Sequence, residues 1–259
     1  MTRSHRNKLN HLVTAMPPGV VLTLPWLEQQ GVSAKLAWWY VKSHWLESVG
    51  EEAYKKSGDS VTWVGALSAL QYQLRLPLHV GGRTALELLG QTHFIPLGGI
   101  QQVVLFATTN VRVPRWFRDS NSWKIKLLVN KTVLFNRQDF SLGVINKAID
   151  GINISLSTPE RAAIEVVALV PHKQHFDEAA KLIETLSQLR PSLLQNLLER
   201  CNSIKAKRLL LYFADKFQHP WLSKLDLTKV DLGKGKRMVG EGGCYDAKYQ
   251  ISVPKIEEE

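Results

Sequence analysis

The sequence predicts an α+β protein, with an N-terminal winged helix-turn-helix followed by a mixed α/β C-terminal domain. Three observations support this fold class. Short helical patterns near the N-terminus lead into two strand-like segments, residues 78–156 are rich in strand patterns, and four helical patterns follow between 159 and 217. A chain of 259 residues with 44% hydrophobic and 22% charged residues can bury one or two cores. We place the two domains at residues 1–95 and 96–259.

The first two helices are short and end at turn-forming residues. The first is predicted from Arg3 to Ala15, because its apolar residues recur at helical spacing and Pro17-Pro18-Gly19 ends it. Thr23 is expected to cap the second, with Pro25 near its first turn and Gln29-Gln30-Gly31 at its end.

A third helix and a hairpin complete the N-terminal pattern. Ser33 is expected to cap a helix over residues 34–43. Residues 45–49 then read as a strand, Gly50-Glu51-Glu52 as a turn and residues 53–56 as a returning strand. Helices followed by a hairpin in this order are typical of a winged helix.

The rest of the chain alternates between strand and helix patterns. A helix capped by Ser60 or Thr62 is predicted to run through Trp63 towards Pro77, and a short helix is expected at residues 84–89. The predicted strands are 78–80, 103–106, 125–129 and 152–156, with a further strand at 248–253. The four later helices are expected near 159–170, 175–189, 192–202 and 204–217.

The charge favours an acidic partner. The net charge is +10 and the pI is near 9.6, and the first 150 residues carry eight of the ten net charges. Nucleic acid is therefore a plausible partner. No apolar run is long enough for a membrane span, and the N-terminus does not resemble a signal peptide. Cys201 and Cys244 are expected to be reduced thiols of an intracellular protein.

The third helix is the main candidate for DNA contact. Lys35, Trp38 and Lys42 fall at positions i, i+3 and i+7, and so share one face. In a helix-turn-helix the second helix enters the major groove by its N-terminal residues, which adds Ser33 to the expected contacts. The alternative is a solvated basic face that binds nothing. The adjacent face, which can pack against the core, holds Leu36, Trp39, Tyr40 and Ser43.

Two further basic segments are weaker candidates. Arg3 and Arg6 can form a basic arm on DNA, although such N-termini are more often simply solvated. Arg112, Arg115 and Arg118 alternate with aromatic residues, which suits either a second nucleic-acid surface or a segment that covers a core; the second interpretation is favoured.

The acidic turn Glu51-Glu52 argues against a contact between the wing and phosphates. His172 and His175 lack a third metal ligand at suitable spacing, so exposed histidines are expected there. The segment Gly233-Lys-Gly-Lys-Arg237 does not fit a phosphate-binding P-loop. No catalytic residue, metal or cofactor is predicted.

The run "VSAKLAWWYVKSHWLESVGEEAYKKSGDSVTWVGALSALQYQLRLPLHVGGRTALELLGQTHFIPLG" resembles the AbiEi-type antitoxins of type IV toxin-antitoxin systems. The ending "LGKGKRMVGEGGCYDAKYQISVP" is also similar to that family, and the block from Gly81 to Leu86 is the most specific part. In that block the paired glycines allow a tight strand-to-helix turn, Thr84 is expected to cap the helix and Arg83 to be a structural anchor.

The resemblance implies a bacterial, cytoplasmic protein that has no catalytic role. No membrane partner is expected, since no run of the sequence is long and apolar enough. It implies an autorepressor that binds inverted repeats in the promoter DNA of its own abortive-infection operon. It also implies an antitoxin that counters a cognate nucleotidyltransferase toxin, directly or indirectly. Ser33, Lys35, Trp38 and Lys42 match the recognition-helix positions of this layout.

Two alternatives stay open. One is a Mg²⁺-dependent DNA-processing nuclease that uses Asp231, Asp246 and Lys248. The other is an effector-responsive regulator without a toxin.

Overall fold

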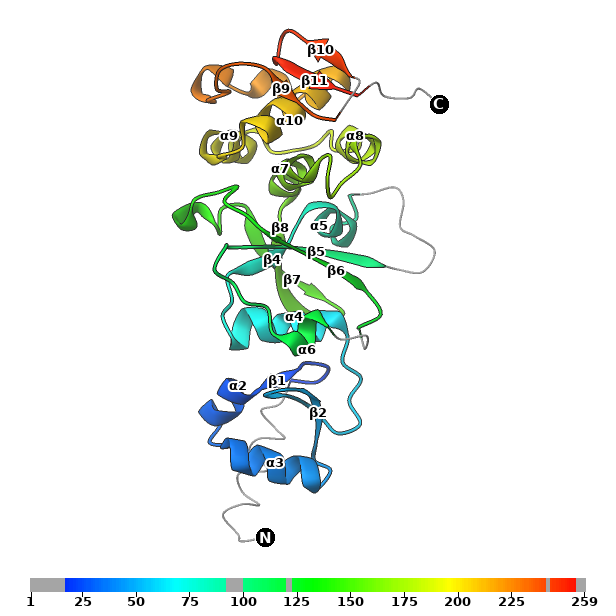
Figure 1. The fold of residues 1–259 in the computed structure, drawn as a ribbon, viewed down its shortest axis with the longest axis vertical. Helices are drawn as coiled ribbons and strands as arrows, with labels where there is room; N and C mark the ends of the chain where they lie inside the picture. Colours follow the sequence, from blue (N-terminus) through cyan, green and yellow to red (C-terminus); the bar gives the residue numbers. More distant parts are fainter. Residues whose placement is uncertain (1–16, 92–99, 120–122, 241–242, 255–259) are drawn as a thin grey trace. The chain divides into compact units, whose positions relative to one another are not determined.

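The computed structural model describes residues 17–91, 100–119, 123–240 and 243–254 (Figure 1). The predicted first helix, with Arg3 and Arg6, lies outside the described residues. The chain forms two compact units. The N-terminal unit comprises the chain up to Leu78 with Asn110–Lys126 and Asn146–Ser155, and the C-terminal unit comprises His79–Thr109, Leu127–Ile145 and the chain from Leu156. The proposed boundary at residue 95 stays a prediction.

The N-terminal unit contains the winged helix that the sequence predicts. Its helices are α2 (Leu24–Gln29) and α3 (Ala34–Lys42), and the Ser33 side chain caps α3. Thr23 occupies the N-cap position of α2 but does not cap it as predicted, because its hydroxyl donates to Gln73 Oε1 instead. Its antiparallel sheet has the order β1-β3-β2. The strands are β1 (Leu22–Thr23), β2 (Leu46–Gly50) and β3 (Ala53–Lys56). The sequence does not predict strand β1, because two residues are too few to show the alternation of apolar and polar residues typical of a strand.

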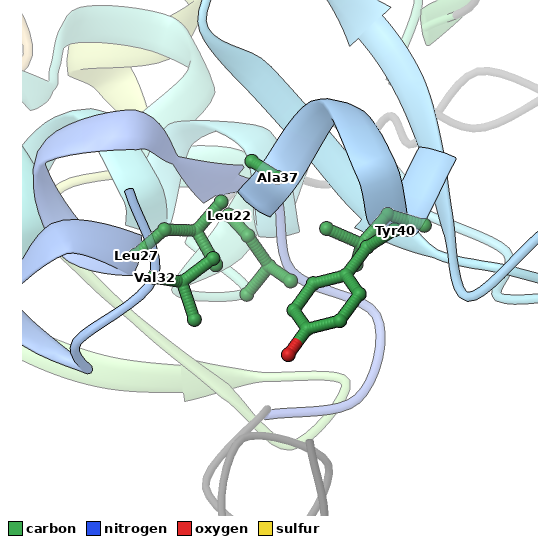
Figure 2. Close-up of a cluster of buried hydrophobic side chains, with 6 residues drawn as sticks. Leu22, Leu27, Val32, Ala37 and Tyr40 are labelled. Atoms are coloured by element: carbon green, nitrogen blue, oxygen red, sulfur yellow. The ribbon is translucent and has the colours of Figure 1, made fainter. Parts of the chain in front are cut away.

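A small apolar core holds α2 and α3 against the sheet (Figure 2). Its side chains come from β1, from β2, from both helices and from the turn that joins α2 to α3. Each of them is at most 1% exposed. The cluster consists of Leu22, Leu27, Val32, Ala37, Tyr40 and Leu46. Burial of this apolar area fixes the angle between α2 and α3 and leaves the opposite face of α3 in solvent.

The next helix has two parts. It begins as α4 (Trp63–Ser68) and continues as a π-helical segment, η1 (Ala69–Gln73). The side-chain amide of Gln73 accepts from the backbone N–H of Thr23 at 2.8 Å and donates to the carbonyl oxygen of Val21 at 2.7 Å. These two bonds hold β1 in place. A one-turn helix, α6 (Arg115–Arg118), packs against β2.

A five-stranded sheet has the order β6-β5-β4-β8-β7. The strands are β4 (Leu78–Val80), β5 (Gln102–Ala107), β6 (Lys126–Lys131), β7 (Val144–Ile149) and β8 (Ile152–Ser157). Strands β4 and β8 are parallel, with Val80 opposite Leu156. The edge strand β7 was not predicted, because exposed and half-buried residues alternate in it without a clear apolar face.

Helices pack around α7 in the C-terminal unit. Helix α5 contacts β5 and α7, and α8, α9 and α10 each contact α7 (Figure 1). Their bounds are α5 (Gly82–Leu88), α7 (Pro159–Leu169), α8 (Phe176–Glu184), α9 (Pro191–Arg200) and α10 (Ile204–Lys216). Helix α8 ends five residues before the predicted end. Near the end of the described chain, a small sheet has the order β10-β11-β9, formed by β9 (Arg237–Met238), β10 (Cys244–Asp246) and β11 (Ile251–Val253).

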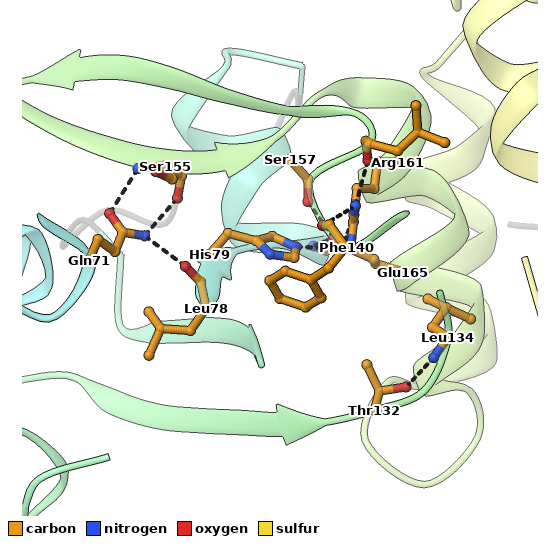
Figure 3. A network of polar contacts seen from close by, with 12 residues as sticks. Gln71, Leu78, His79, Thr132, Leu134, Phe140, Ser155, Ser157, Arg161 and Glu165 are labelled. Carbon is orange, nitrogen blue, oxygen red and sulfur yellow. Dashed lines mark hydrogen bonds and ion pairs between the residues drawn. The ribbon is translucent and has the colours of Figure 1, made fainter. Parts of the chain in front are cut away.

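A buried polar network centred on Glu165 ties α7 to the parallel strands (Figure 3). Oε1 of Glu165 contacts His79 Nε2 at 2.7 Å and Arg161 Nε at 2.9 Å, and Oε2 accepts from Ser157 Oγ at 2.7 Å and Gly82 N at 3.0 Å. Burial alone would raise the pKa of Glu165, but these partners lower it to about 2. The carboxylate is therefore ionised and balanced by Arg161.

The two glycines after β4 permit this arrangement. A Cβ on Gly81 would lie 2.3 Å from Glu165 Oε2, and Gly82 has φ +53°. Thr84 does not cap the helix as predicted, because α5 already begins at Gly82. Its hydroxyl instead bridges to β5, donating to Gln102 O and accepting from Val104 N. Arg83 pairs with Glu87 at 2.6 Å, which agrees with a structural role.

Candidate nucleic-acid interface

The exposed surface of α3 combines cations with aromatic rings. Ser33, Lys35, Trp38 and Lys42 are all exposed, and the Lys42 ammonium lies 5.5 Å from the centre of the Trp38 ring. The structure therefore brings the four sequence-predicted residues onto one helix. Ser33 has a second task, because its Oγ accepts the Leu36 amide at 3.4 Å and caps the helix.

The prediction that Trp39 lies on the packing face of α3 is wrong. It is 47% exposed, beside Trp38 at 58%. At 100° per residue, Trp39 lies nearer to Lys35 than to Tyr40, whereas Ala37 and Tyr40 face the core. The helical angle alone was enough to place Trp39 on the candidate interface.

The charge on this surface has one sign. Residues 33–44 contain no acidic residue. The carboxylate of Glu47, on β2, is paired with Lys55 at 2.9 Å. Hydrogen bonds from Lys55, Gly58 and Ser57 lower the pKa of Glu47 to about 2. The two lysines of α3 thus remain available for phosphates, and the N-terminal amides of α3 add a favourable dipole.

The wing is short and held close to the helices. Its turn consists of Glu51 and Glu52, both exposed, and Glu52 O accepts the Leu24 amide at 2.8 Å. A Cβ on Gly50 would lie 2.5 Å from Trp116 Cβ, so the hairpin also packs closely on α6. An acidic turn with these attachments is poorly suited to enter a minor groove.

Arginines 112, 115 and 118 belong to the same compact unit as α3, and all three are exposed. The aromatic residues between them, Trp116 and Phe117, are buried, so they serve the core rather than base stacking. Arg118 forms two hydrogen bonds with Asp119, which raise the pKa of Arg118. Arg112 and Arg115 are therefore the stronger candidates for a second basic surface.

The residues of the nuclease alternative have other roles. Asp231 accepts the Gly233 amide, Asp246 accepts the Tyr249 amide, and Lys248 pairs with Asp215 at 2.7 Å. Within the described ranges, no group of three or more His, Cys, Asp or Glu side chains is placed to hold a metal ion. Both cysteines are free thiols.

A cavity of about 350 Å³ lies in the C-terminal unit, between the end of α7, the start of α10 and the end of β6. Lys205 reaches across it and donates to the carbonyls of Ala168 and Val170, and burial lowers the pKa of this lysine. Lys173 donates to Asn130 at 2.8 Å. Two lysines and no carboxylate line the cavity among the described residues.

A helix-turn-helix with a cationic second helix and a short antiparallel wing, followed by an α/β domain, defines a winged-helix transcriptional regulator. The chain belongs to the AbiEi family. Residues 5–97 match the model described as "Transcriptional regulator, AbiEi antitoxin N-terminal domain", and residues 100–254 match "Transcriptional regulator, AbiEi antitoxin, Type IV TA system". The protein is thus a transcriptional regulator of the antitoxin type from type IV toxin-antitoxin systems.

A solved structure supports the same fold. The RV2827C protein from Mycobacterium tuberculosis superposes with a TM-score of 0.62 at 13% sequence identity, over 97% of this chain and 92% of that chain. No curated protein matches the sequence. None of the described helices is both long and apolar enough to cross a lipid bilayer.

Proposed function

We propose that this protein represses its own operon by binding inverted repeats in the promoter and also counters a nucleotidyltransferase toxin encoded with it. The observation that supports this best is the exposed surface of α3, where Lys35 and Lys42 flank Trp38 and Trp39, residues 33–44 contain no acidic residue and Glu47 is paired with Lys55. The surface has the charge for phosphates and the aromatic area for thymine methyl groups and sugars.

The recognition contacts have different roles in this proposal. Ser33 and Lys35, at the N-terminal end of α3, read base edges in the major groove. Lys42, one helix length away, contacts a phosphate, and the ring of Trp38 holds its ammonium in place. Arg112 and Arg115 extend the basic surface, and Arg3 and Arg6 act as an N-terminal arm.

The antitoxin role is assigned to the part of the chain beyond the winged helix. Both family models carry the antitoxin description, so the assignment rests on the use of α3 for DNA, which leaves the segment 100–254 for the toxin. This segment forms most of the C-terminal unit. The protein acts in the bacterial cytoplasm, where its promoter and the toxin are found. It is not an enzyme in this proposal, and toxin neutralisation takes place directly or indirectly.

Two assays with the wild-type protein test the proposal. Purified protein should shift a promoter fragment that carries the inverted repeats and not a fragment with the repeats scrambled. Co-expression should restore the growth of cells that express the neighbouring nucleotidyltransferase. A protein that shifts both fragments equally, or does not restore growth, would contradict the proposal.

The cavity favours a second candidate, an effector-responsive regulator. Lys173 and Lys205 line it together with His172, so a small anion is the ligand class that fits. In that case a small anion should change the affinity for promoter DNA, and Lys173→Gln should abolish this response. An affinity for the promoter that is the same with and without such anions would exclude this candidate.

A further inference from the structure

Residues Gly233–Arg237 form a basic loop in the C-terminal unit, here called the glycine-lysine loop. It places Lys234, Lys236 and Arg237 within four residues. Gly233 and Gly235 have φ values of +64° and +76°, in the left-handed region that favours glycine. The loop therefore has a defined backbone shape that depends on its glycines.

The buried side chain of Arg208, on α10, fixes the backbone of the loop. It is 2% exposed, and it donates to the carbonyls of Leu232 at 2.8 Å, Gly233 at 3.0 Å and Gly235 at 2.6 Å. It also donates to Gln250 O at 2.9 Å. No carboxylate pairs with this guanidinium among the described side chains, so its positive charge stays uncompensated beneath the loop. Because the carbonyls turn inward, the outer side of the loop is rich in donors.

The outward side presents amides and cations. The amides of Gly233 and Arg237 are satisfied by Asp231 and Gln250. Within the described part of the chain, the amides of Lys234, Gly235 and Lys236 have no acceptor. Residues with positive φ alternate in this turn with residues that have negative φ, so successive free amides can point to one anion. Such amides, with lysines around them, are typical of a phosphate-binding backbone.

An aromatic ring lies beside these donors. Tyr245 on β10 is 46% exposed, and the Lys236 ammonium lies 4.8 Å from the centre of its ring. Met238, directly after the loop, is 71% exposed. Cations next to a partly exposed aromatic ring suit a phosphate and an unpaired base together.

We propose that the glycine-lysine loop and Tyr245 form a second nucleic-acid site, which binds the phosphodiester backbone and a base of an unpaired strand. This site differs from α3, which suits duplex DNA. An acidic protein surface is the alternative partner for a basic loop. The unpaired amides and the exposed ring favour nucleic acid, because a protein carboxylate partner requires neither.

The test is fluorescence anisotropy with labelled RNA and DNA homopolymers of about 12 nucleotides. The Lys234→Gln/Lys236→Gln variant should lower the slope of log affinity against log salt by about 1.4, because each phosphate contact on a single strand contributes about 0.7. Lys216→Gln/Lys224→Gln is the matched control, since it removes two exposed lysines outside the loop. Tyr245→Leu should weaken binding by about 5-fold or more at constant salt.

Equal binding of RNA and DNA would support recognition through the shared backbone, and tighter binding of RNA would support a contribution from the 2′-hydroxyl. The proposal is wrong if wild-type protein binds neither strand, or if the loop variant and its control lose the same slope. It is also wrong if the loop variant binds strands normally but no longer restores growth against the toxin, which would make the loop a protein-binding surface. The Lys35→Ala/Lys42→Ala variant should keep strand binding, so failure of this site and failure of the promoter site are distinguishable.

Discussion

Lys42 and Lys35 share one exposed surface but lie at opposite ends of α3. If Lys42 contacts a phosphate, Lys42→Ala should lower the slope of log promoter affinity against log salt by about 0.9 and weaken all duplexes alike. The measurement is a salt titration of promoter and random DNA. An unchanged slope together with unchanged affinity would remove Lys42 from the interface.

Lys35 lies near the N-terminus of the helix, where a side chain can reach base edges. Lys35→Ala should reduce the preference for the promoter over random DNA by about 1–3 kcal/mol if it reads a guanine. Competition binding with the two duplexes measures this difference. Equal losses on both would assign Lys35 to the phosphate backbone instead.

His79 gives the C-terminal unit a dependence on pH. Burial lowers its pKa, and the neighbouring Glu165 only partly opposes this effect. The unfolded chain therefore binds a proton near pH 6.5 that the folded chain does not bind, so stability falls as the pH drops below about 6.5. Burial also lowers the pKa of His219, which adds a second contribution of the same sign.

The His79→Gln substitution removes one of the two histidines that take up a proton on unfolding. The side-chain amide of the new glutamine can still donate a hydrogen bond to Glu165. Between about pH 6 and pH 5, the free energy of unfolding should fall less steeply in this variant than in the wild type, with a difference in slope of up to about 1.4 kcal/mol per pH unit. Chemical unfolding at a series of pH values measures the slope. The exposed His175→Gln variant serves as the control, and an unchanged slope in His79→Gln would show that His79 is charged in the folded protein.

At the scale of elements, the wing is poorly suited to contact DNA. Its acidic turn is attached to α2 through the Leu24 amide. Glu51→Lys/Glu52→Lys should tighten binding to random DNA at low salt, because two repulsive charges become attractive. Gel shifts at several salt concentrations test this, with Glu28→Lys on α2 as a control for net charge. No change in affinity would mean that the turn points away from the duplex.

The sequence predicted most elements because their apolar periods and caps are strong. The Ser33 cap, the helix after it and the four helices from Pro159 onward were all recovered. Strands β1, β7, β9 and β10 were missed, because they are too short or too exposed to show a period. These strands owe their pairing to neighbours that are distant in the sequence.

Side-chain roles were harder to predict than elements. The cationic positions on α3 followed from spacing, and the same helical spacing places Trp39 beside Lys35 on the exposed surface. The Glu165 network joins His79 and Glu165, which are 86 positions apart in the sequence. No local sequence motif predicts that these two side chains meet. Likewise, the contact of Arg208 with the glycine-lysine loop spans distant positions and has no sequence signature.

In the whole molecule, the two compact units do not follow a single cut in the chain. The N-terminal unit includes Asn110–Lys126 and Asn146–Ser155, and α6 within the first of these packs on β2. A truncation at residue 95 removes these segments from that unit. Point variants on the surface of α3 therefore separate the DNA-binding role from the antitoxin role more cleanly than fragments do.

The most direct test measures both activities of one variant in the same cells. In Lys35→Ala/Lys42→Ala, both substitutions lie on the exposed face of α3, opposite its core residues Ala37 and Tyr40. A promoter reporter should lose repression in this variant, while growth in the presence of the cognate toxin should be restored as fully as by the wild type. Repression that persists, or the loss of both activities in a variant that is still folded, would contradict the central claim that α3 binds the promoter and a different surface counters the toxin.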